Sequence, residues 1–317
     1  MLKAIARAKV NPFLRVLPPR DDGFHDIVSL FVSIDLQDEL TLLGEAQQSS
    51  LEVSYVDDFV KEQQMDLGES NLVLKGQKLY LKAINKEDDH FRWHLRKAIP
   101  LASGLGGGSA DSAACLLLLN EHYGKPLCEE ELLTLSAKVG ADVPFCLTGG
   151  TALVEGIGDV IEPLLPLPTL GVLLLRPNVG METPKAYAAL DSQYGWEPGM
   201  AEVKGAKEGA RARIDGLVER LRHLNLPRAA PLVDNDFQEL LKRKLPHIED
   251  ILQTLERAGG QLQFMTGSGS CLVAFTEDEE RAKVLQEKTN YLSEVSWRHT
   301  CTIASVGAEL VETKEEG

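Results

Sequence analysis

Residues 97–120 read KAIPLASGLGGGSADSAACLLLLN, and this stretch organises the rest of the chain. Glycines at 104, 106, 107 and 108 precede Ser109 and a run rich in Ala and Leu. Glycine permits left-handed backbone angles and lets a backbone approach a ligand closely. The Ala- and Leu-rich run favours a helix, and Ser109 is expected to cap it. Because a helix N-terminus carries unpaired N–H donors and partial positive charge, the stretch predicts a phosphate cradle built mainly from backbone.

The pattern differs from two common phosphate-binding motifs. No Gly-Lys-Ser/Thr follows at the spacing of a Walker loop, and Ser109 stands where a dinucleotide fingerprint has its third glycine. From this stretch alone, a tight connection between strand and helix without any ligand remains the alternative.

Composition limits the class of protein. The chain has 317 residues, of which 44% are hydrophobic, so one large or two ordinary domains are expected. No apolar run approaches the ~18 residues of a membrane span, and the opening residues lack a secretory signal pattern. The five cysteines are widely spaced without a C-x-x-C pair, so neither a zinc site nor a disulfide framework is expected. Reduced thiols in a cytoplasmic protein fit this pattern.

The net charge is −15, which argues against nonspecific binding to nucleic acid or to an anionic membrane. Residues 1–20 and 90–110 run against this charge, because both are basic and contain no acid. Chance is one reading. The other is that both stretches line an electropositive cleft for anionic ligands.

Hydrophobic periodicity predicts a first unit with mixed elements. Strands are expected at 2–17, 26–34, 39–43, 51–56 and 91–99, helices at 71–84, after the glycines and at 129–139, and a hairpin at 151–165. Pro12 predicts an edge or an irregularity in the first strand.

The composition shifts across Pro163, Pro166 and Pro168, so we expect domains at 1–165 and 166–317. The second unit is expected to contain a strand at 171–176, helices at 234–243 and 247–258, strands at 261–265 and 271–276, a helix at 279–288 and a strand at 300–306. This order is that of a ferredoxin-like layer. Residues 196–228 allow a loose helical hairpin or an insertion, and the tail from 313 to 317 is expected to fray.

Several motifs together resemble the GHMP small-molecule kinases. Pro100, three further residues and Gly104-Leu105-Gly106 are similar to the phosphate loop of that family. The other similar segments, in the family's order, are Ala8-Lys9-Val10-Asn11, Asp22-Gly23-Phe24-His25, Gly140-Ala141-Asp142-Val143-Pro144, Asn235-Asp236-Phe237 and Thr266-Gly267-Ser268-Gly269-Ser270. The resemblance covers essentially the whole chain. It implies an α+β, two-domain GHMP kinase fold, with an N-terminal ribosomal-protein-S5-domain-2-like domain and a C-terminal ferredoxin-like domain.

The resemblance also implies an activity. It indicates an ATP-dependent phosphotransferase with an alcohol group as acceptor and with Mg²⁺ as a second cofactor. Asp22-Gly23-Phe24-His25 resembles the motif of one branch, which phosphorylates a cytidine-diphosphate-linked polyol on the way to isoprenoid precursors. The partner would then be a small molecule, with no nucleic acid and no membrane. Kinases of homoserine, mevalonate or sugars remain alternatives, as does a non-catalytic nucleotide-binding regulator. The oligomeric state is left open.

The resemblance assigns roles by position. Lys9 and Asp142 correspond to the catalytic pair, although a lone lysine on a strand is more often only solvated. The expected ATP-binding residues are Asn71, Lys97, Pro100, Leu101, Ala102, Ser103, Gly104, Leu105, Gly106, Gly107, Gly108, Ser109 and Ala110. The expected substrate-binding residues are Asn11, Phe24, His25, Asp142, Thr183 and Tyr187. Gly267 and Gly269 would let a turn approach phosphates. Metal ligands are unassigned, with Ser109 as the candidate.

The base-binding residues have distinct expected tasks. Tyr187 would stack on cytosine, and His25 would read its hydrogen-bonding edge, because its two nitrogens can donate and accept. Phe24 replaces the tyrosine of the family, so a hydroxyl contact is lost there while stacking remains. Pro12 stands in place of an aliphatic residue, and Ser103 in place of a frequent glycine.

Overall fold

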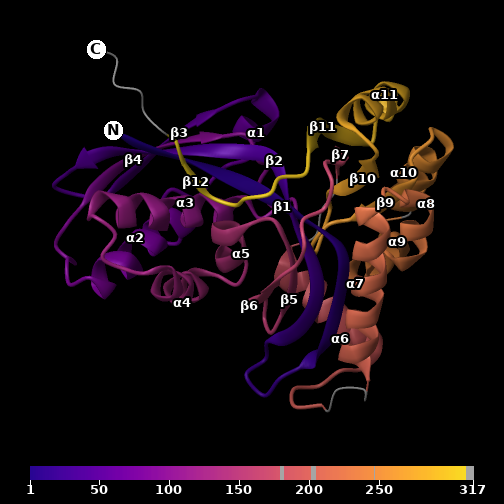
Figure 1. Cartoon of the computed structure of the whole chain (residues 1–317), viewed down its shortest axis with the longest axis horizontal. Coiled ribbons are helices and arrows are strands. Elements are labelled where there is room, and N and C mark those ends of the chain that lie inside the picture. Colours follow the sequence, from indigo (N-terminus) through magenta and orange to yellow (C-terminus); the bar gives the residue numbers. More distant parts are fainter. Residues whose placement is uncertain (179–181, 201–204, 246, 312–317) are drawn as a thin grey trace.

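The computed structural model describes residues 1–178, 182–200, 205–245 and 247–311. Two sheets, each covered by helices, lie next to one another (Figure 1). Within the described ranges, none of the helices combines the length and the apolar character that crossing a membrane requires.

The first sheet is built on a long antiparallel pair, β1 (Leu2–Pro19) and β2 (His25–Glu45). Its central order is β12-β1-β2-β4-β3, with β3 at Ser50–Tyr55 and β4 at Phe91–Lys97. The hairpin of β5 (Thr151–Glu155) and β6 (Val160–Pro163) also joins β2.

The strands expected at 26–34 and 39–43 are one continuous strand, so the predicted break is wrong. Asp35 and Gln37 interrupt the apolar run, but β2 pairs with β1 on both sides of them. What changes along β2 is the strand at its other edge: residues 29–32 pair with β5, and residues 39–45 pair with β4.

Pro12 produces the predicted irregularity. The register of β1 on β2 shifts between Val10 and Phe13, as expected where a residue lacks the N–H that a ladder needs.

Helices α2 (Leu72–Ala83), α3 (Gly107–His122) and α4 (Glu129–Val139) lie on one side of the first sheet (Figure 1). The short helix α5 (Val143–Thr148) packs against α3 and α4, and the short helix α1 (Asp58–Glu62) lies beside β3. Helix α3 begins directly at the glycines, where its N-cap, Gly106, has φ +74°. Ser109 therefore lies inside the first turn, and the prediction that it caps the helix is wrong.

The second sheet is antiparallel, in the order β11-β7-β10-β9. Its strands are β7 (Gly171–Pro177), β9 (Leu262–Met265), β10 (Leu272–Thr276) and β11 (Val295–Thr302), and its helices are α9 (Asp236–Lys244), α10 (His247–Arg257) and α11 (Glu279–Thr289). The predicted ferredoxin-like order of strands and helices is confirmed. The last strand starts earlier than predicted, because Val295 and Trp297 already bury their side chains where it pairs with β7.

The chain between the two sheets is more helical than predicted. Helix α6 (Thr183–Tyr194) follows β7 and was not expected. The segment 196–228, for which the sequence allows a helical hairpin or an insertion, contains α7 (Ala206–Arg222) and α8 (Leu226–Ala229). Helix α7 lies beside β2 (Figure 1) and buries Ile214, Leu217 and Leu221 in the core. It is therefore an integral part of the fold.

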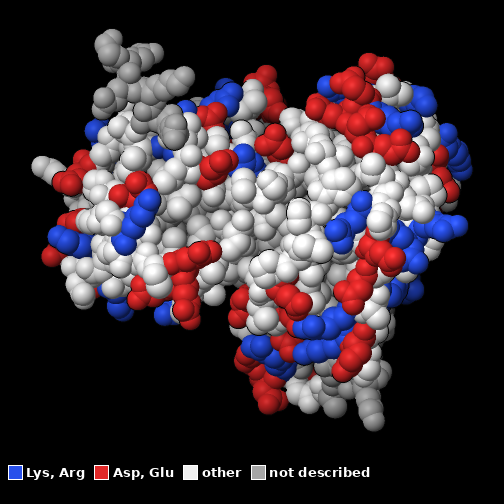
Figure 2. Space-filling view, in the orientation of Figure 1, with Lys and Arg blue, Asp and Glu red and all other residues white. Residues whose placement is uncertain are grey.

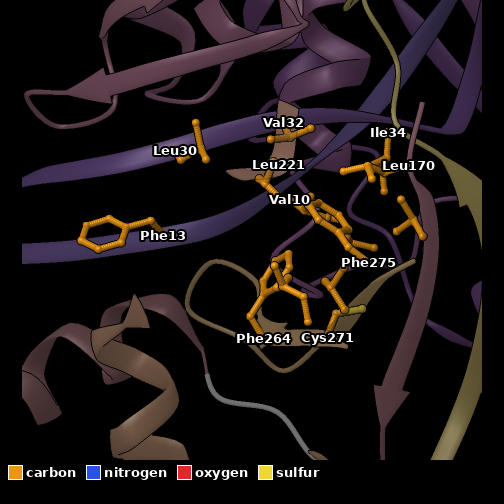
Figure 3. Packing of buried hydrophobic residues seen from close by; sticks show 14 of the residues in the cluster. Val10, Phe13, Leu30, Val32, Ile34, Leu170, Leu221, Phe264, Cys271 and Phe275 are labelled. Atoms are coloured by element: carbon orange, nitrogen blue, oxygen red, sulfur yellow. The ribbon is translucent and has the colours of Figure 1, made fainter. Parts of the chain in front are cut away.

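The two halves of the chain share a core. Val10 and Phe13 of β1 and Val32 of β2 meet Phe264 and Phe275 of the second sheet in one buried cluster (Figure 3). Two short strands of the second half also return to β1, namely β8 (Asp234–Asn235) and β12 (Glu309–Val311). The boundary between 165 and 166 stays a proposal, and the shared core implies that the halves hold a fixed arrangement.

A buried cation joins the first sheet to the glycine-rich stretch. Lys97 Nζ donates to Asp38 Oδ2 at 2.5 Å and to Asp111 Oδ2 at 2.7 Å, and all three side chains are fully buried. Asp38 Oδ1 also accepts from the amides of Ala98 and Ile99. The triad therefore connects β2, the end of β4 and the first turns of α3.

The charges of this triad are strongly coupled. Burial lowers the pKa of Lys97, but Asp111 and Asp38 outweigh that effect and hold it above its ordinary value. Burial raises the pKa of the Asp111 carboxyl well above its ordinary value, although Lys97 acts in the opposite direction.

Lys97→Met should lower the free energy of unfolding by about 3–5 kcal/mol, because removing one partner leaves buried charge uncompensated. Adding Asp111→Asn should recover part of the loss. The matched control is Arg96→Met, whose half-exposed cation pairs with Glu39 at the surface and should cost at most about 1 kcal/mol. Urea unfolding measures all three variants. Equal, small losses for Lys97→Met and Arg96→Met would contradict this role.

Candidate active site

A cavity of about 820 Å³ lies where the two halves of the chain meet. Its walls come from β1 and the turn before β2, from the glycine-rich stretch, from the loop before α5, from α6 and from the turn after β9. Lys9, Asn11, Phe24, His25, Asp142, Thr183 and Tyr187 all line it. The structure thus brings together the residues expected at the catalytic and substrate-binding positions.

The glycine-rich stretch forms one wall. Residues 100–104 and 106–109 line the cavity, whereas Leu105 and Ala110 are fully buried in the core. The amides of Gly107, Gly108 and Ser109 belong to the first turn of α3, where a helix has no internal acceptor for them. This wall can therefore bind an anion through backbone donors and the helix dipole.

Lys9 and Asp142 face each other at this wall. Lys9 Nζ lies 3.4 Å from Asp142 Oδ2 and donates to Asn11 Oδ1 at 2.7 Å. The lysine is almost fully buried, its ammonium lies 4.8 Å from the centre of the Phe31 ring, and its stem runs against Gly106. The ammonium is therefore held in one place, while Asp142 keeps about a third of its side chain exposed to the cavity.

The local fold explains why Asp142 is available. It is the N-cap residue of α5, and its main-chain carbonyl accepts the hydrogen bond from the amide of Cys146. Its carboxylate makes no capping hydrogen bond and is free to accept a proton or a ligand donor.

Asn11 connects the two halves of the chain through hydrogen bonds. Its Oδ1 accepts from Lys9 and also from Thr266 Oγ1 at 3.1 Å, and its main-chain N–H donates to the same hydroxyl at 3.0 Å. Its Nδ2 contacts Ser29 Oγ at 3.4 Å. Asn11 thus orients Lys9, and we propose this positioning role beside the expected substrate contact.

The turn after β9 touches the glycine-rich stretch. A Cβ on Gly104 would lie 2.3 Å from the Thr266 carbonyl oxygen, and a Cβ on Gly267 would lie 3.1 Å from Gly104. Both glycines have positive φ, +79° and +57°. The amide of Cys271 also donates to the Ser103 carbonyl. Only residues without side chains fit at this contact, which closes the cavity between the two halves.

Aromatic residues line the end of the cavity that lies away from the glycine-rich wall. Phe24 is 58% exposed and lines the cavity. His25 is buried, its Nδ1 donates to the Leu17 carbonyl at 2.8 Å, and its ring centre lies 4.9 Å from that of Tyr187. Burial, with a smaller contribution from Asp142, raises the pKa of the Tyr187 hydroxyl, so this ring stays neutral. The end can hold a flat, uncharged ring.

Two residues expected to bind ATP lie elsewhere. Asn71 caps α2, with Oδ1 accepting from the Val73 amide and Nδ2 donating to the Asp66 carbonyl. Lys97 is enclosed by its two carboxylates. Neither side chain lines the cavity, so we now propose structural roles for both.

The expected electropositive cleft is not formed. Arg7, Arg15 and Arg96 pair with acids far away in the sequence, and Arg20 pairs with the nearby Asp22 and Asp26. Figure 2 shows blue and red side chains side by side at several places on the visible face. Among the described lysines and arginines, only Lys9 lines the cavity. Pairing across the fold, which a sequence window cannot show, therefore offsets the charge of Arg7, Arg15 and Arg96.

The sequence did not single out Asp191, Trp196 or the Thr266 hydroxyl. Asp191 lines the cavity from α6, and Trp196 lies 6.0 Å from His25 between ring centres. Thr183, Tyr187 and Asp191 are spaced by four residues and so share one helix face. This spacing would have indicated Asp191, had the helix itself been predicted.

Comparison with known proteins agrees with this geometry. Residues 71–150 match the family model of the GHMP kinase N-terminal domain, and residues 217–291 match that of the GHMP kinase C-terminal domain. A crystal structure of a 4-(cytidine 5'-diphospho)-2C-methyl-D-erythritol kinase superposes with a TM-score of 0.73 at 27% identity, covering 95% of this chain and 99% of that one. A homoserine kinase of Cytophaga hutchinsonii superposes with a TM-score of 0.72 over 98% and 97% of the chains, but at 20% identity it shows the fold alone.

The fold, the loop and these matches define a class: this chain belongs to the GHMP kinases, and the expected α+β GHMP kinase fold is confirmed. Within that family, a relative from Pelotomaculum thermopropionicum is 34% identical over 284 residues, which are 89% of this chain and 92% of the relative. That relative is a 4-diphosphocytidyl-2-C-methyl-D-erythritol kinase.

Proposed function

We propose that this protein is an ATP-dependent kinase that phosphorylates the 2-hydroxyl of 4-diphosphocytidyl-2-C-methyl-D-erythritol, in the non-mevalonate route to isoprenoid precursors. The observation that carries the proposal is one cavity that combines a backbone phosphate cradle, the Lys9–Asp142 pair at 3.4 Å and an aromatic end with His25. The name of the relative that matches most of the chain supports the choice of substrate.

The proposed reaction uses the two ends of the cavity together. The triphosphate lies on the amides of the α3 N-terminus, and the cytosine lies at the aromatic end. The acceptor oxygen attacks the γ-phosphorus, the bond from that phosphorus to the β–γ bridging oxygen breaks, and ADP leaves. The hydroxyl proton passes to Asp142, while Lys9 neutralises charge on the transferred group.

Mg²⁺ is proposed as a cofactor that arrives with ATP. In the described part of the chain, no three His, Cys, Asp or Glu side chains gather as a metal site. Mg²⁺ commonly takes one or two protein oxygens and completes its shell with water and phosphate. The Ser109 hydroxyl is an oxygen ligand on the wall of the same cavity, so the residues fit this mode. When bound, the ion would offset phosphate charge.

The alternatives differ in their acceptors. A homoserine, mevalonate or sugar kinase would share the loop and the Lys9–Asp142 pair but would not need an aromatic end with a histidine. A non-catalytic nucleotide-binding regulator would not need the pair. The Phe24, His25 and Tyr187 cluster therefore favours the cytidyl acceptor.

The direct test is turnover of ATP with a panel of acceptors, namely the cytidyl polyol, homoserine, mevalonate and galactose, followed by phosphorus NMR of the product. We expect a new phosphomonoester only with the cytidyl polyol. Phosphorylation of another acceptor, or binding of ATP without transfer to any of the four, would overturn the proposal.

Asp142→Asn should lower kcat by about 10²-fold or more, which is the usual scale for a general base. ATP affinity should change little, because the phosphate cradle is mostly backbone. Asp88→Asn removes the same charge at an exposed site and serves as the control. Calorimetry with a non-hydrolysable ATP analogue checks binding. Near-normal turnover in a folded Asp142→Asn protein would remove Asp142 from the chemistry.

A further inference from the structure

The hydroxyl of Thr266 lies at the junction of the two halves and bonds to Asn11 twice. It accepts from the main-chain N–H of Asn11 at 3.0 Å and donates to Asn11 Oδ1 at 3.1 Å. The Gly104 carbonyl, at 3.5 Å, is the more distant acceptor for the same hydrogen. Thr266 is fully buried, so water does not compete for these bonds. One hydroxyl of the second half thus holds both the main chain and the side chain of Asn11.

The orientation of the Asn11 amide follows from its other neighbours. Lys9 can only donate, so the atom that faces its Nζ at 2.7 Å is the carbonyl oxygen Oδ1. Nδ2 then donates to Ser29 Oγ at 3.4 Å, and that hydroxyl can accept because its own hydrogen goes to the Phe13 carbonyl. Oδ1 therefore receives one hydrogen from Lys9 and one from Thr266, which uses both of its lone pairs.

The turn that carries Thr266 is better supported than the strand that carries Asn11. Asn11 lies next to Pro12, where the register of β1 on β2 shifts. In the turn after β9, the amide of Thr266 donates to the Cys271 carbonyl at 3.0 Å, and the Thr266 carbonyl accepts from the Gly269 amide at 3.1 Å. The main chain of Thr266 is therefore fixed, and its hydroxyl supports Asn11 where the strand is irregular.

We propose that Thr266 is a positioning residue for Lys9 and that it acts through Asn11. This inference rests on the proposed function, since it concerns the cation of that reaction. Lysine carries its charge on a flexible four-carbon stem, whereas phosphoryl transfer needs the cation in place when charge develops. One of the three Nζ hydrogens of Lys9 goes to Asn11, and Asp142 lies 3.4 Å away. The second half thus sets the position of a cation that the first half carries.

The first test compares the kinetics of Thr266→Val, Thr266→Ser and the wild type with ATP and the cytidyl polyol. Valine puts a methyl group in place of the hydroxyl and cannot bond to Asn11. We expect kcat to fall by about 10-fold or more, because a small displacement of a catalytic group is costly. KM for both substrates should change by less than about 3-fold, as for a contact made mainly in the transition state. Thr266→Ser keeps the hydroxyl and should retain most of kcat.

Thr289→Val is the matched control. Thr289 is equally buried, lies in α11 of the same half, and its hydroxyl donates to the Leu285 carbonyl at 2.9 Å. Its loss should leave kcat unchanged. The proposal is overturned if Thr289→Val lowers kcat as much as Thr266→Val does. It is also overturned if Thr266→Val acts mainly on KM for ATP, because Thr266 would then only support the glycine-rich wall.

The second test does not depend on turnover. Among the described lysines, Lys9 and Lys97 are the buried ones. Protection from solvent slows hydrogen exchange, so nitrogen NMR can follow both ammonium groups, and Lys9→Met identifies the Lys9 signal. In Thr266→Val the Lys9 signal should shift or broaden through faster exchange, while the Lys97 signal stays unchanged as an internal reference.

The two tests separate this inference from the proposed function. If the wild type phosphorylates none of the acceptors, the proposed function fails, and the NMR comparison still decides whether Thr266 positions Lys9. A Lys9 signal that is the same in Thr266→Val, Thr289→Val and the wild type would overturn the inference, whatever the activity.

Discussion

The contact between two glycine turns determines how the rest of the site is arranged. Gly104 meets the backbone of Thr266 so closely that a Cβ would lie 2.3 Å from a carbonyl oxygen. At that contact the Thr266 hydroxyl reaches Asn11, and Asn11 in turn holds Lys9. One steric constraint thus links the glycine-rich wall of the cavity, Lys9 and the second sheet. A kinase needs such alignment, because phosphoryl transfer depends mainly on positioning and charge stabilisation.

Buried structure on both sides keeps this contact in place. The core that β1 and β2 share with the second sheet fixes the two halves relative to one another (Figure 3). Beneath the glycines, Lys97 with Asp38 and Asp111 attaches α3 to the first sheet. The cavity itself carries little fixed charge beyond Lys9, Asp142 and Asp191. The fold therefore supplies backbone donors and geometry, and the ligands bring most of the charge.

Local patterns in the sequence were sufficient to predict the glycine-rich turn before a helix and most strands and helices. The pairing of Lys9 with Asp142 followed only from the resemblance to the GHMP kinases. Features that depend on distant partners were not accessible. Lys97 lies near the loop in sequence, but its role is set by Asp38, far away along the chain. The basic stretches looked electropositive because their acidic partners lie outside any short window. Asp191 was missed because α6 was not predicted, and without the helix its spacing from Tyr187 carried no meaning.

The most direct measurement compares Gly104→Ala with Gly124→Ala. Both glycines have similar positive φ, +79° and +76°, but a Cβ on Gly124 would meet nothing within 4 Å. Backbone strain of about 1–2 kcal/mol is therefore common to both, and only Gly104→Ala forces the two turns apart. The account predicts that Gly104→Ala loses far more kcat/KM for ATP, and more unfolding free energy, than Gly124→Ala. Equal effects of the two variants on both quantities would contradict it.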